Sequence, residues 1–297
     1  MRQLLPTVAE LTRTHMDELR PAERRVARAL LANYPGAGLS TAAELAEVAS
    51  VSTPTVVRFA TRLGLDGYTD LQARLLGELD ARRASPVSRA ATEIKGSRPS
   101  DIVRRGGRHR AELIVESMSS IPPSELQSAV SALADPAHTI LLTGGYFSHL
   151  VARYFSIQLA QIRSHVHYVA EPAHRDIGYL LEAGKRHVLV SFDLRRYEQE
   201  ARVAVREARR RGATTIVITD EWLSPAAATA DIVLPVAVRA EPFDSLTAVL
   251  CLVESMIPAL VSAIGPSAVQ RMQTWEQLDA RRHLLDASLI DGQTVPD

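Results

Sequence analysis

Apolar residues in the first part of the chain recur at helical spacing. In VAELTRTHMDEL and PAERRVARALLANY they return every three or four positions, which is typical of amphipathic helices. Pro21 is a favoured first residue of a helix, and Thr41 with Glu44 carries the signature of a capping box. Two further helices are predicted for TPTVVRFATRL and YTDLQARLLGEL. The sequence therefore predicts an all-α domain over residues 1–82.

The pattern of apolar positions changes after residue 106. Short apolar runs occur at HTILLTGG, HVHYVA, RHVLVSF, ATTIVITD and DIVLPVA, most of them separated by stretches with helical periodicity. A long buried helix is expected for SLTAVLCLVESMIPALVSAI. Short strands that alternate with helices of about ten or more residues indicate a parallel sheet covered by helices on both faces. We expect an α/β domain over residues 107–297.

Residues 83–106 link the two predicted domains. They are rich in Arg, Ser, Pro and Gly and poor in large apolar residues, and a helix is expected to begin near Asp101. The basic charge suits either a solvated connector or an arm that follows a phosphate backbone. We favour the connector, because most charged runs are simply solvated.

Composition and charge narrow the function classes only slightly. The chain has 297 residues and zero formal net charge, so any contact with nucleic acid must depend on the local distribution of charge. Cys251 is the single cysteine, so no disulfide can form within the chain, as fits a reducing cytosol. The N-terminus lacks the apolar core of a signal peptide, and no run of about 18 apolar residues predicts a membrane span. We expect a cytoplasmic protein without membrane contact.

Two short helices, expected at 41–49 and 52–63, have the spacing of a helix-turn-helix. Its inward face is expected to contain Leu45, Ala46, Val51, Val56, Val57 and Leu63. No acidic residue lies between Val48 and Leu65, so the local field is positive. Recognition helices read bases with their N-terminal residues, where hydroxyl groups and arginine bind phosphates and base edges. The alternative is a simple cap and a solvated face. The predicted DNA-contacting residues are Ser52, Thr53, Thr55, Arg58 and Arg62.

The same residues carry a resemblance to a known family. LRPAERRVARALLANYP and STAAELAEVASVSTPTVVRFATRLGLDGYTDLQARL, with the α/β segment that follows, resemble the RpiR/MurR family of bacterial transcriptional regulators. The run VSTPTVVRFATRLGLDGY is the most specific part. The resemblance covers nearly the whole chain and implies a helix-turn-helix domain joined to a sugar isomerase (SIS) domain. It further implies that residues 1–82 bind an operator, while the SIS domain senses a metabolite and forms homo-oligomers.

A first ligand-site candidate follows the strand HTILLTGG. Ligands of open α/β sheets lie outside the carboxyl ends of the strands. Gly144 and Gly145 allow close approach of the backbone, and Ser148 lies in the first turn of the next helix, where N–H groups suit an anion. An ordinary strand-to-helix turn would contain the same residues.

A second candidate is SFDLRRYEQE, where the SIS family usually has a Ser-x-Ser-Gly-x-Thr/Ser loop that cradles a sugar phosphate. Ser191 matches the first serine, but Asp193, Leu194 and Arg196 replace the second serine, the glycine and the last hydroxyl residue. Leucine lacks the conformational freedom of glycine. Asp193 would repel a phosphate, whereas Arg195 and Arg196 would attract it. Binding of an anion through arginine, binding of an unphosphorylated ligand, no binding, and a surface ion cluster all remain open.

Together these patterns predict a transcriptional regulator. It would bind a double-stranded, two-fold DNA operator as a homodimer or homotetramer, and its SIS domain would sense a phosphorylated sugar or another anion. An alternative is a sugar-phosphate isomerase with an accessory helical domain, with Glu171, His174 and Glu241 as acid–base candidates. A third is a SIS domain that only oligomerises. Because the sequence has no nucleophile elbow, P-loop or metal motif, we expect no enzyme activity, catalytic residue, metal site or cofactor.

Overall fold

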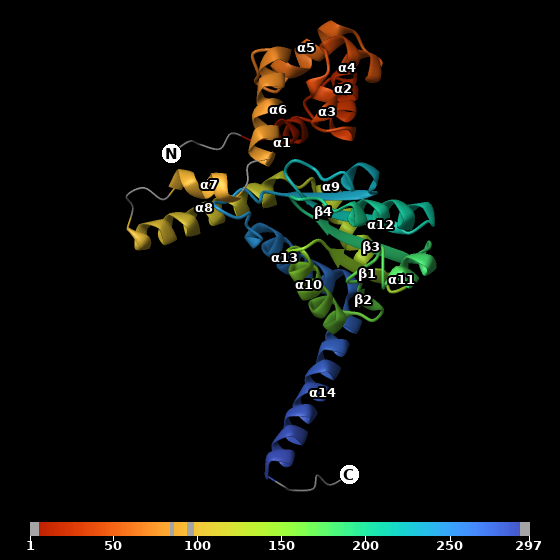
Figure 1. The fold of residues 1–297 in the computed structure, drawn as a ribbon. Coiled ribbons are helices and arrows are strands. Elements are labelled where there is room, and N and C mark those ends of the chain that lie inside the picture. Colours follow the sequence, from red (N-terminus) through yellow and green to blue (C-terminus); the bar gives the residue numbers. More distant parts are fainter. Residues whose placement is uncertain (1–5, 84–85, 94–97, 292–297) are drawn as a thin grey trace.

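The computed structural model describes residues 6–83, 86–93 and 98–291. Six helices form the N-terminal domain at one end of the molecule, and the last helix projects from the opposite end (Figure 1). The capping box predicted at Thr41 and Glu44 is confirmed: the hydroxyl accepts from the Glu44 amide, and the Glu44 carboxylate accepts from the Thr41 amide. The six helices are α1 Val8–Thr14, α2 Pro21–Ala32, α3 Gly36–Leu39, α4 Ala42–Val48, α5 Thr53–Arg62 and α6 Tyr68–Arg83.

The core of the N-terminal domain is formed by the apolar stripes of its helices. Leu30, Leu45, Phe59 and Leu71 are completely buried in it. Val57 was expected on this inward face, and that expectation is wrong, because its side chain is 41% exposed. The amphipathic stripe of α5 therefore runs through Phe59, and Val57 faces outward.

The segment between the two domains is helical over much of its length. It contains α7 Pro86–Glu93 and the beginning of α8 Pro99–Ser120. The helix expected near Asp101 begins two residues earlier, because Pro99 can take the first helical position without losing a hydrogen bond. Both glycines of the pair 106–107 lie inside α8, so they do not interrupt it.

The C-terminal domain contains the predicted parallel sheet. All neighbouring strands are parallel, and the order is β2-β1-β3-β4-β5. The strands are β1 Thr139–Gly144, β2 Val166–Tyr168, β3 His187–Asp193, β4 Thr214–Asp220 and β5 Ile232–Val236. The other elements of this domain are α9 Pro123–Ala134, α10 His149–Ile162, α11 Ile177–Glu182, α12 Gln199–Arg210, the 3-10 helix η1 Ala227–Thr229, α13 Thr247–Ile264 and α14 Pro266–Asp291.

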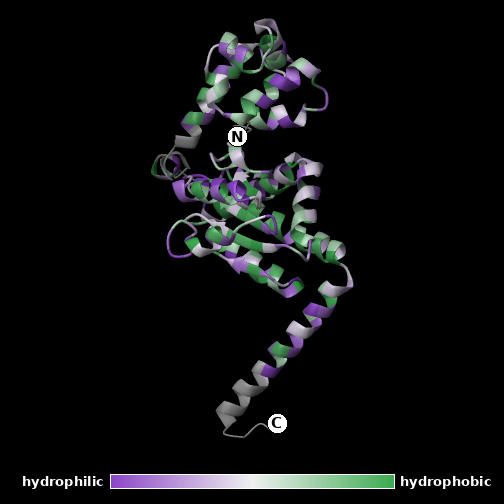
Figure 2. Cartoon of the chain, turned by 90° about the vertical axis from the view of Figure 1, so that its right-hand side faces the viewer, coloured by the Kyte–Doolittle hydropathy of each residue, from purple (hydrophilic) through white to green (hydrophobic). Residues whose placement is uncertain are grey.

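Helices cover both faces of this sheet, as predicted. Along β1, Ile140 and Leu142 belong to the core shared with α9, α10 and α13, whereas Leu141 between them belongs to the core shared with α11 and α12. This alternation follows from the two-residue period of a strand. Figure 2 shows hydrophobic residues concentrated along the strands and on the helices that pack against them. Helix α13 is also long and apolar enough, by length and composition, to cross a membrane, but one side of it packs into the first core.

The strand order creates a switch point between β1 and β3. The chain leaves β1 for β2 on one side and later places β3 on the other side of β1. In such sheets a crevice opens between the carboxyl ends of the two strands, and ligands bind there. The two predicted ligand loops follow these strands, so the topology brings them together.

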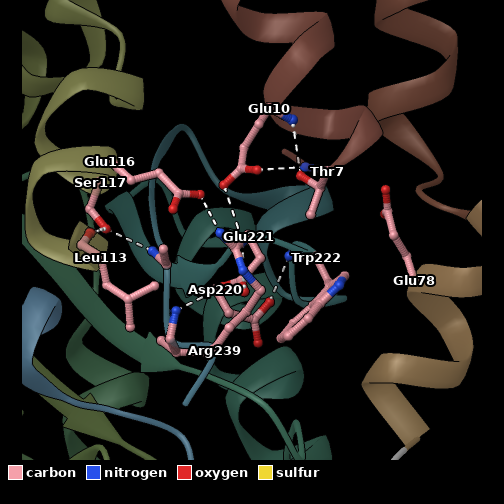
Figure 3. Close-up of polar contacts among 12 residues, drawn as sticks. Thr7, Glu10, Glu78, Leu113, Glu116, Ser117, Asp220, Glu221, Trp222 and Arg239 are labelled. Atoms are coloured by element: carbon pink, nitrogen blue, oxygen red, sulfur yellow. Dashed lines mark hydrogen bonds and ion pairs between the residues drawn. The ribbon is translucent and has the colours of Figure 1, made fainter. Parts of the chain in front are cut away.

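A buried charge cluster joins the two domains (Figure 3). Arg239, just after β5, lies 3.1 Å from a carboxylate oxygen of Glu221 and 3.6 Å from one of Glu10, and it also pairs with Glu116. Glu10 belongs to α1 of the N-terminal domain, Glu116 to α8, and Glu221 to the loop after β4. Burial raises the pKa of Glu221 to about 8, although Arg239 acts against this. One arginine therefore contacts three carboxyl groups from both domains.

Candidate DNA-binding and ligand-binding sites

Helices α4 and α5 form the predicted helix-turn-helix. The turn between them brings the amide of Val51 to within 2.9 Å of the carbonyl oxygen of Ala46. Ser50 adopts a left-handed conformation with φ of 52°, which reverses the chain in few residues. Helix α5 then presents a continuous outward face. The exposed residues at and within α5 are Ser52, Thr53, Pro54, Val57, Arg58, Thr61 and Arg62.

Thr55 does not belong to this exposed face, so the expectation that it points outward is wrong. Only 6% of the residue is exposed, because it lies four positions before Phe59 and therefore on the buried side of the helix. Its hydroxyl is 3.0 Å from the hydroxyl of Ser52 and accepts a hydrogen bond of 3.0 Å from Arg58. Thr55 thus orients two candidate DNA-contacting side chains.

The remaining candidates on α5 stay accessible. Ser52 is the N-cap residue by position, but its side chain makes no capping hydrogen bond. Arg62 lies 3.9 Å from the buried carboxylate of Glu23, at the limit of an ion pair, and keeps 42% of its side chain exposed, so it stays accessible. Contact of Ser52, Thr53, Arg58 and Arg62 with DNA stays a prediction.

The predicted ligand residues gather around two adjoining cavities at the β1/β3 switch point. The large crevice cavity, of about 650 Å³, lies beside Arg89, Tyr146, Phe147 and Phe243. The small crevice cavity, of about 320 Å³, also contains Glu171 and His174. Gly145, Ser148, Asp193, Arg195 and Arg196 line the large cavity, whereas Gly144, Gly145 and Ser191 line the small one.

The loop after β1 is tightly fitted to β3. A Cβ atom at Gly144 would come within 2.7 Å of the backbone of His149, so only glycine allows α10 to start this close to the strand. The hydroxyl of Ser148 accepts from the amide of Gly145 at 2.9 Å and donates to the carbonyl of Phe192 at 2.6 Å. Ser148 therefore fixes the two loops to each other, and its hydroxyl is already engaged.

Glu198 is the main crevice residue that the sequence analysis missed. Its carboxylate accepts a hydrogen bond of 2.7 Å from the amide of Tyr146, and it lines both cavities. An anion could use this amide, but a carboxylate of the chain itself occupies it. The only signal in the sequence was an acidic residue immediately before a helix, and such residues are usually read as caps.

Asp193 and Ser191 are buried beneath the crevice. Burial raises the pKa of Asp193 to about 7, while a hydrogen bond from Ser224 opposes the shift and the charge of Asp220 adds to it. One carboxylate oxygen of Asp193 and the hydroxyl oxygen of Ser191 have no hydrogen-bond partner among the described residues. A buried carboxyl group that is partly protonated near neutral pH repels an anion less than an ionised one.

The two arginines of the second loop have different surroundings. Arg195 lies 2.9 Å from Asp244, which also pairs with Arg89 at 2.7 Å, and its guanidinium stacks on Trp222. Arg196 is exposed and has a positive φ of 74°. The left-handed position is therefore Arg196, and Leu194 does not need the freedom of glycine. A surface ion cluster is ruled out for Asp193 and Arg195, because both side chains are buried.

Comparisons with known proteins agree with this architecture. Residues 7–82 match the helix-turn-helix domain of the rpiR family, and residues 133–259 match the SIS domain. Together the two matches cover more than half of the chain. The chain belongs to the RpiR family of transcriptional regulators.

Relatives of this RpiR-family chain match it over most of its length. It is 26% identical over 275 residues to the uncharacterized HTH-type transcriptional regulator YbbH of Bacillus subtilis, covering 92% of this chain and 95% of that protein. The sugar isomerase domain of an RpiR transcription factor from Sphaerobacter thermophilus is 21% identical, with a TM-score of 0.55, over 58% of this chain and 97% of that chain. The Vibrio vulnificus NanR protein complexed with ManNAc-6P is 18% identical, with a TM-score of 0.52. This match covers 91% of this chain and 97% of the NanR chain. The two structures support the fold.

The acid–base candidates of the isomerase alternative are only partly brought together. Glu171 and His174 line the small crevice cavity with Ser191, whereas Glu241 lines neither crevice cavity. His174 lies 3.8 Å from Glu200 at the surface. Among the residues that the structure describes, no group of three or more His, Cys, Asp and Glu side chains could hold a metal ion.

Proposed function

We propose that this chain binds a double-stranded DNA operator through α5 and a phosphorylated sugar in the large crevice cavity. The observation that carries the proposal is the exposed face of α5, which bears hydroxyl groups and two arginines and no acidic residue. Such a face, on the second helix of a helix-turn-helix, fits the major groove. The match to the rpiR-family helix-turn-helix domain and the description of YbbH as a regulator support this part.

The effector part rests on the crevice. Its polar groups include the amide of Tyr146 and the exposed guanidinium of Arg196, while Tyr146, Phe147 and Phe243 supply apolar surface for a sugar ring. NanR, which shares this fold, was solved with ManNAc-6P. A phosphate that displaced the Glu198 carboxylate from the Tyr146 amide would gain the pairing with Arg196. We place the protein in the cytoplasm and assign it a homodimeric or homotetrameric state, since a two-fold operator calls for two copies.

The test of DNA binding is selection of bound fragments from random and genomic DNA with the purified full-length chain. The Arg58→Ala variant removes a charge from the exposed face, and Arg74→Ala, on α6 outside the helix-turn-helix, is the matched control. We expect an enriched two-fold motif that Arg58→Ala loses and Arg74→Ala keeps. Enrichment that is unchanged in Arg58→Ala would refute the assignment of α5.

The effector is tested by calorimetric titration with a panel of hexose and hexosamine phosphates. Binding should weaken in Arg196→Ala, while operator affinity without the sugar phosphate stays as in the wild type. The same panel is assayed for aldose–ketose turnover, because Glu171 and His174 lie in the neighbouring cavity. Turnover would favour the isomerase function. Equal affinity of the wild type and Arg196→Ala for the sugar phosphate would place the effector site elsewhere.

A further inference from the structure

A second cavity lies between the two domains, away from the crevice. It has a volume of about 580 Å³. Its walls come from the end of α1 and from α2 on one side, and from α9, α12 and the loop after β4 on the other. Three arginines line it: Arg13 and Arg28 from the N-terminal domain, and Arg202 from the SIS domain. We refer to it as the interdomain cavity.

The three guanidinium groups of the interdomain cavity are not engaged by the side chains and backbone that the structure describes. Among the described residues, Arg13, Arg28 and Arg202 make no hydrogen bond or ion pair through their side chains. The charged group that lines the cavity with them is Glu125, whose carboxylate already accepts from the amide of Val233 at 2.9 Å. The lining therefore carries an excess of positive charge, although the whole chain is neutral.

Arg13 is the most informative of the three. The residue as a whole is partly exposed, yet both terminal nitrogens of its guanidinium are buried and have no hydrogen-bond partner among residues 6–83, 86–93 and 98–291. Burial lowers the pKa of Arg13, and Glu10 and Tyr34 oppose this. Glu10 is itself engaged by Arg239, and Tyr34 donates to Glu78. A guanidinium stays charged in proteins, so burying it without a partner is costly unless an anion completes the site.

The backbone beside the cavity also departs from common geometry. Leu223, which lines it, has a φ of 58°. A bulky residue rarely adopts this left-handed conformation, and strain of this kind clusters at ligand sites and switch regions. The side chain of Asn33 and the loop at Ser224 and Pro225 complete the wall. Apolar surface is available from Leu31, Pro122, Ala227 and Val233.

We propose that the interdomain cavity is a binding site for a small organic phosphate, of the size and chemistry of a nucleoside phosphate. Arginine forks suit phosphate oxygens, and a cavity of this volume holds a ligand of drug-like size. The apolar wall fits a base or another flat ring. Because Arg202 lies across the cavity from Arg13 and Arg28, one bound phosphate compound bridges both domains and holds the DNA-binding helices against the SIS domain. This site is separate from the crevice.

The proposal is tested by calorimetry on the full-length chain with pyrophosphate, adenosine monophosphate and adenosine as probes. We expect the two phosphates to bind and adenosine to bind far more weakly. Arg28→Ala and Arg202→Ala should each weaken phosphate binding about tenfold or more, since each removes a charged hydrogen-bond donor. Both residues are exposed and form no hydrogen bond or ion pair through their side chains in the described part of the chain, so these variants are expected to fold.

Two controls make the result decisive. Arg206 is exposed on α12, four residues after Arg202, but does not line the cavity, so Arg206→Ala should bind the phosphates as the wild type does. Arg196→Ala, in the crevice, should also leave this binding unchanged. No binding by the wild type, an equal loss in Arg206→Ala, or a loss confined to Arg196→Ala would each overturn the proposal.

Discussion

The guanidinium of Arg195 lies over the ring of Trp222, 4.8 Å from its centroid. Arg195 lines the large crevice cavity, and Trp222 follows Glu221, which pairs with Arg239 between the domains. The backbone of Trp222 is fixed by Asp220, which also accepts from the hydroxyl of Tyr197 in the crevice loop. The loop after β4 therefore contacts the crevice through Trp222 and the charge cluster between the domains through Glu221.

Replacing Trp222 should loosen both places. Trp222→Ala is expected to cost about 3–5 kcal/mol of unfolding free energy, because it empties a large buried site. Amide hydrogen exchange should rise in residues 193–198 and in α1. Phe155→Ala, in the core between α10 and the sheet, is the matched control: it should cost a similar free energy without raising exchange in α1. Equal amide exchange of α1 in the two variants would argue that the loop after β4 does not connect the crevice with the N-terminal domain.

Removing Arg239 should separate the domains. Arg239→Ala leaves the carboxyl groups of Glu10, Glu116 and Glu221 together without their cation, and breaking such a buried cluster costs about 3–5 kcal/mol. We expect a lower unfolding free energy and a larger radius of gyration in X-ray scattering. The exposed pair of Arg209 and Asp231 gives the control, since Arg209→Ala should cost less than about 1 kcal/mol. An unchanged radius in Arg239→Ala would show that other contacts hold the domains.

Stability should fall as the pH rises. The pKa of Glu221 is raised from 4.5 to about 8 by burial, so the folded state binds a proton that the unfolded state has lost between these values. The contribution is fully present below pH 4.5 and is lost as the pH rises through about 8. Burial also raises the pKa values of Glu78 and Asp193 to about 7, so these groups add to the loss of stability at high pH.

Urea unfolding at a series of pH values measures this effect. The wild type should lose a free energy of unfolding on the order of a few kcal/mol between pH 5 and pH 8.5. Glu221→Gln keeps the shape of the side chain but cannot titrate, so its profile should be flatter. A profile that is as steep in Glu221→Gln as in the wild type would assign the titration to other groups.

Thr55 should influence DNA binding without touching DNA. Thr55→Val keeps the shape of the side chain but removes the hydroxyl that orients Ser52 and Arg58. We expect operator affinity to fall about threefold to tenfold, as for loss of one or two hydrogen bonds. Unfolding free energy should change by less than about 1.5 kcal/mol. Mobility-shift titration and thermal unfolding give the two numbers, and an affinity equal to that of the wild type would make Thr55 a packing residue only.

Features set by local spacing could be predicted from the sequence. The capping box at Thr41 and Glu44 needs only four consecutive residues, and the alternation along β1 follows from the pleat. The buried face of α5 was harder to predict, because Val56 and Val57 are adjacent apolar residues and only one of them points into the core. Phe59 resolves the choice: residues three and four positions before it share its buried face, which includes Thr55 and Val56 but not Val57.

Features that depend on distant segments could not be predicted. Glu198 reaches the amide of Tyr146 across 52 positions, and Arg239 meets Glu10 across the domain boundary. The interdomain cavity needs arginines from three helices, and none of them stands out in its own stretch of sequence. Helix α11 is short and α14 is largely polar, so neither produced a strong pattern of apolar positions. In each case the information lies in tertiary packing.

Because Glu198 accepts a hydrogen bond from the Tyr146 amide, its carboxylate competes with any bound anion for that amide. Any anion that uses the Tyr146 amide must first displace this carboxylate, which the chain itself holds 2.7 Å from the amide nitrogen and therefore at a high local concentration. The apparent dissociation constant is the intrinsic one divided by the fraction of molecules in which the amide is vacant. If the crevice binds the effector as proposed, a trace amount of the anion would leave most Tyr146 amides occupied by Glu198, and Glu198 would raise the concentration at which the response begins.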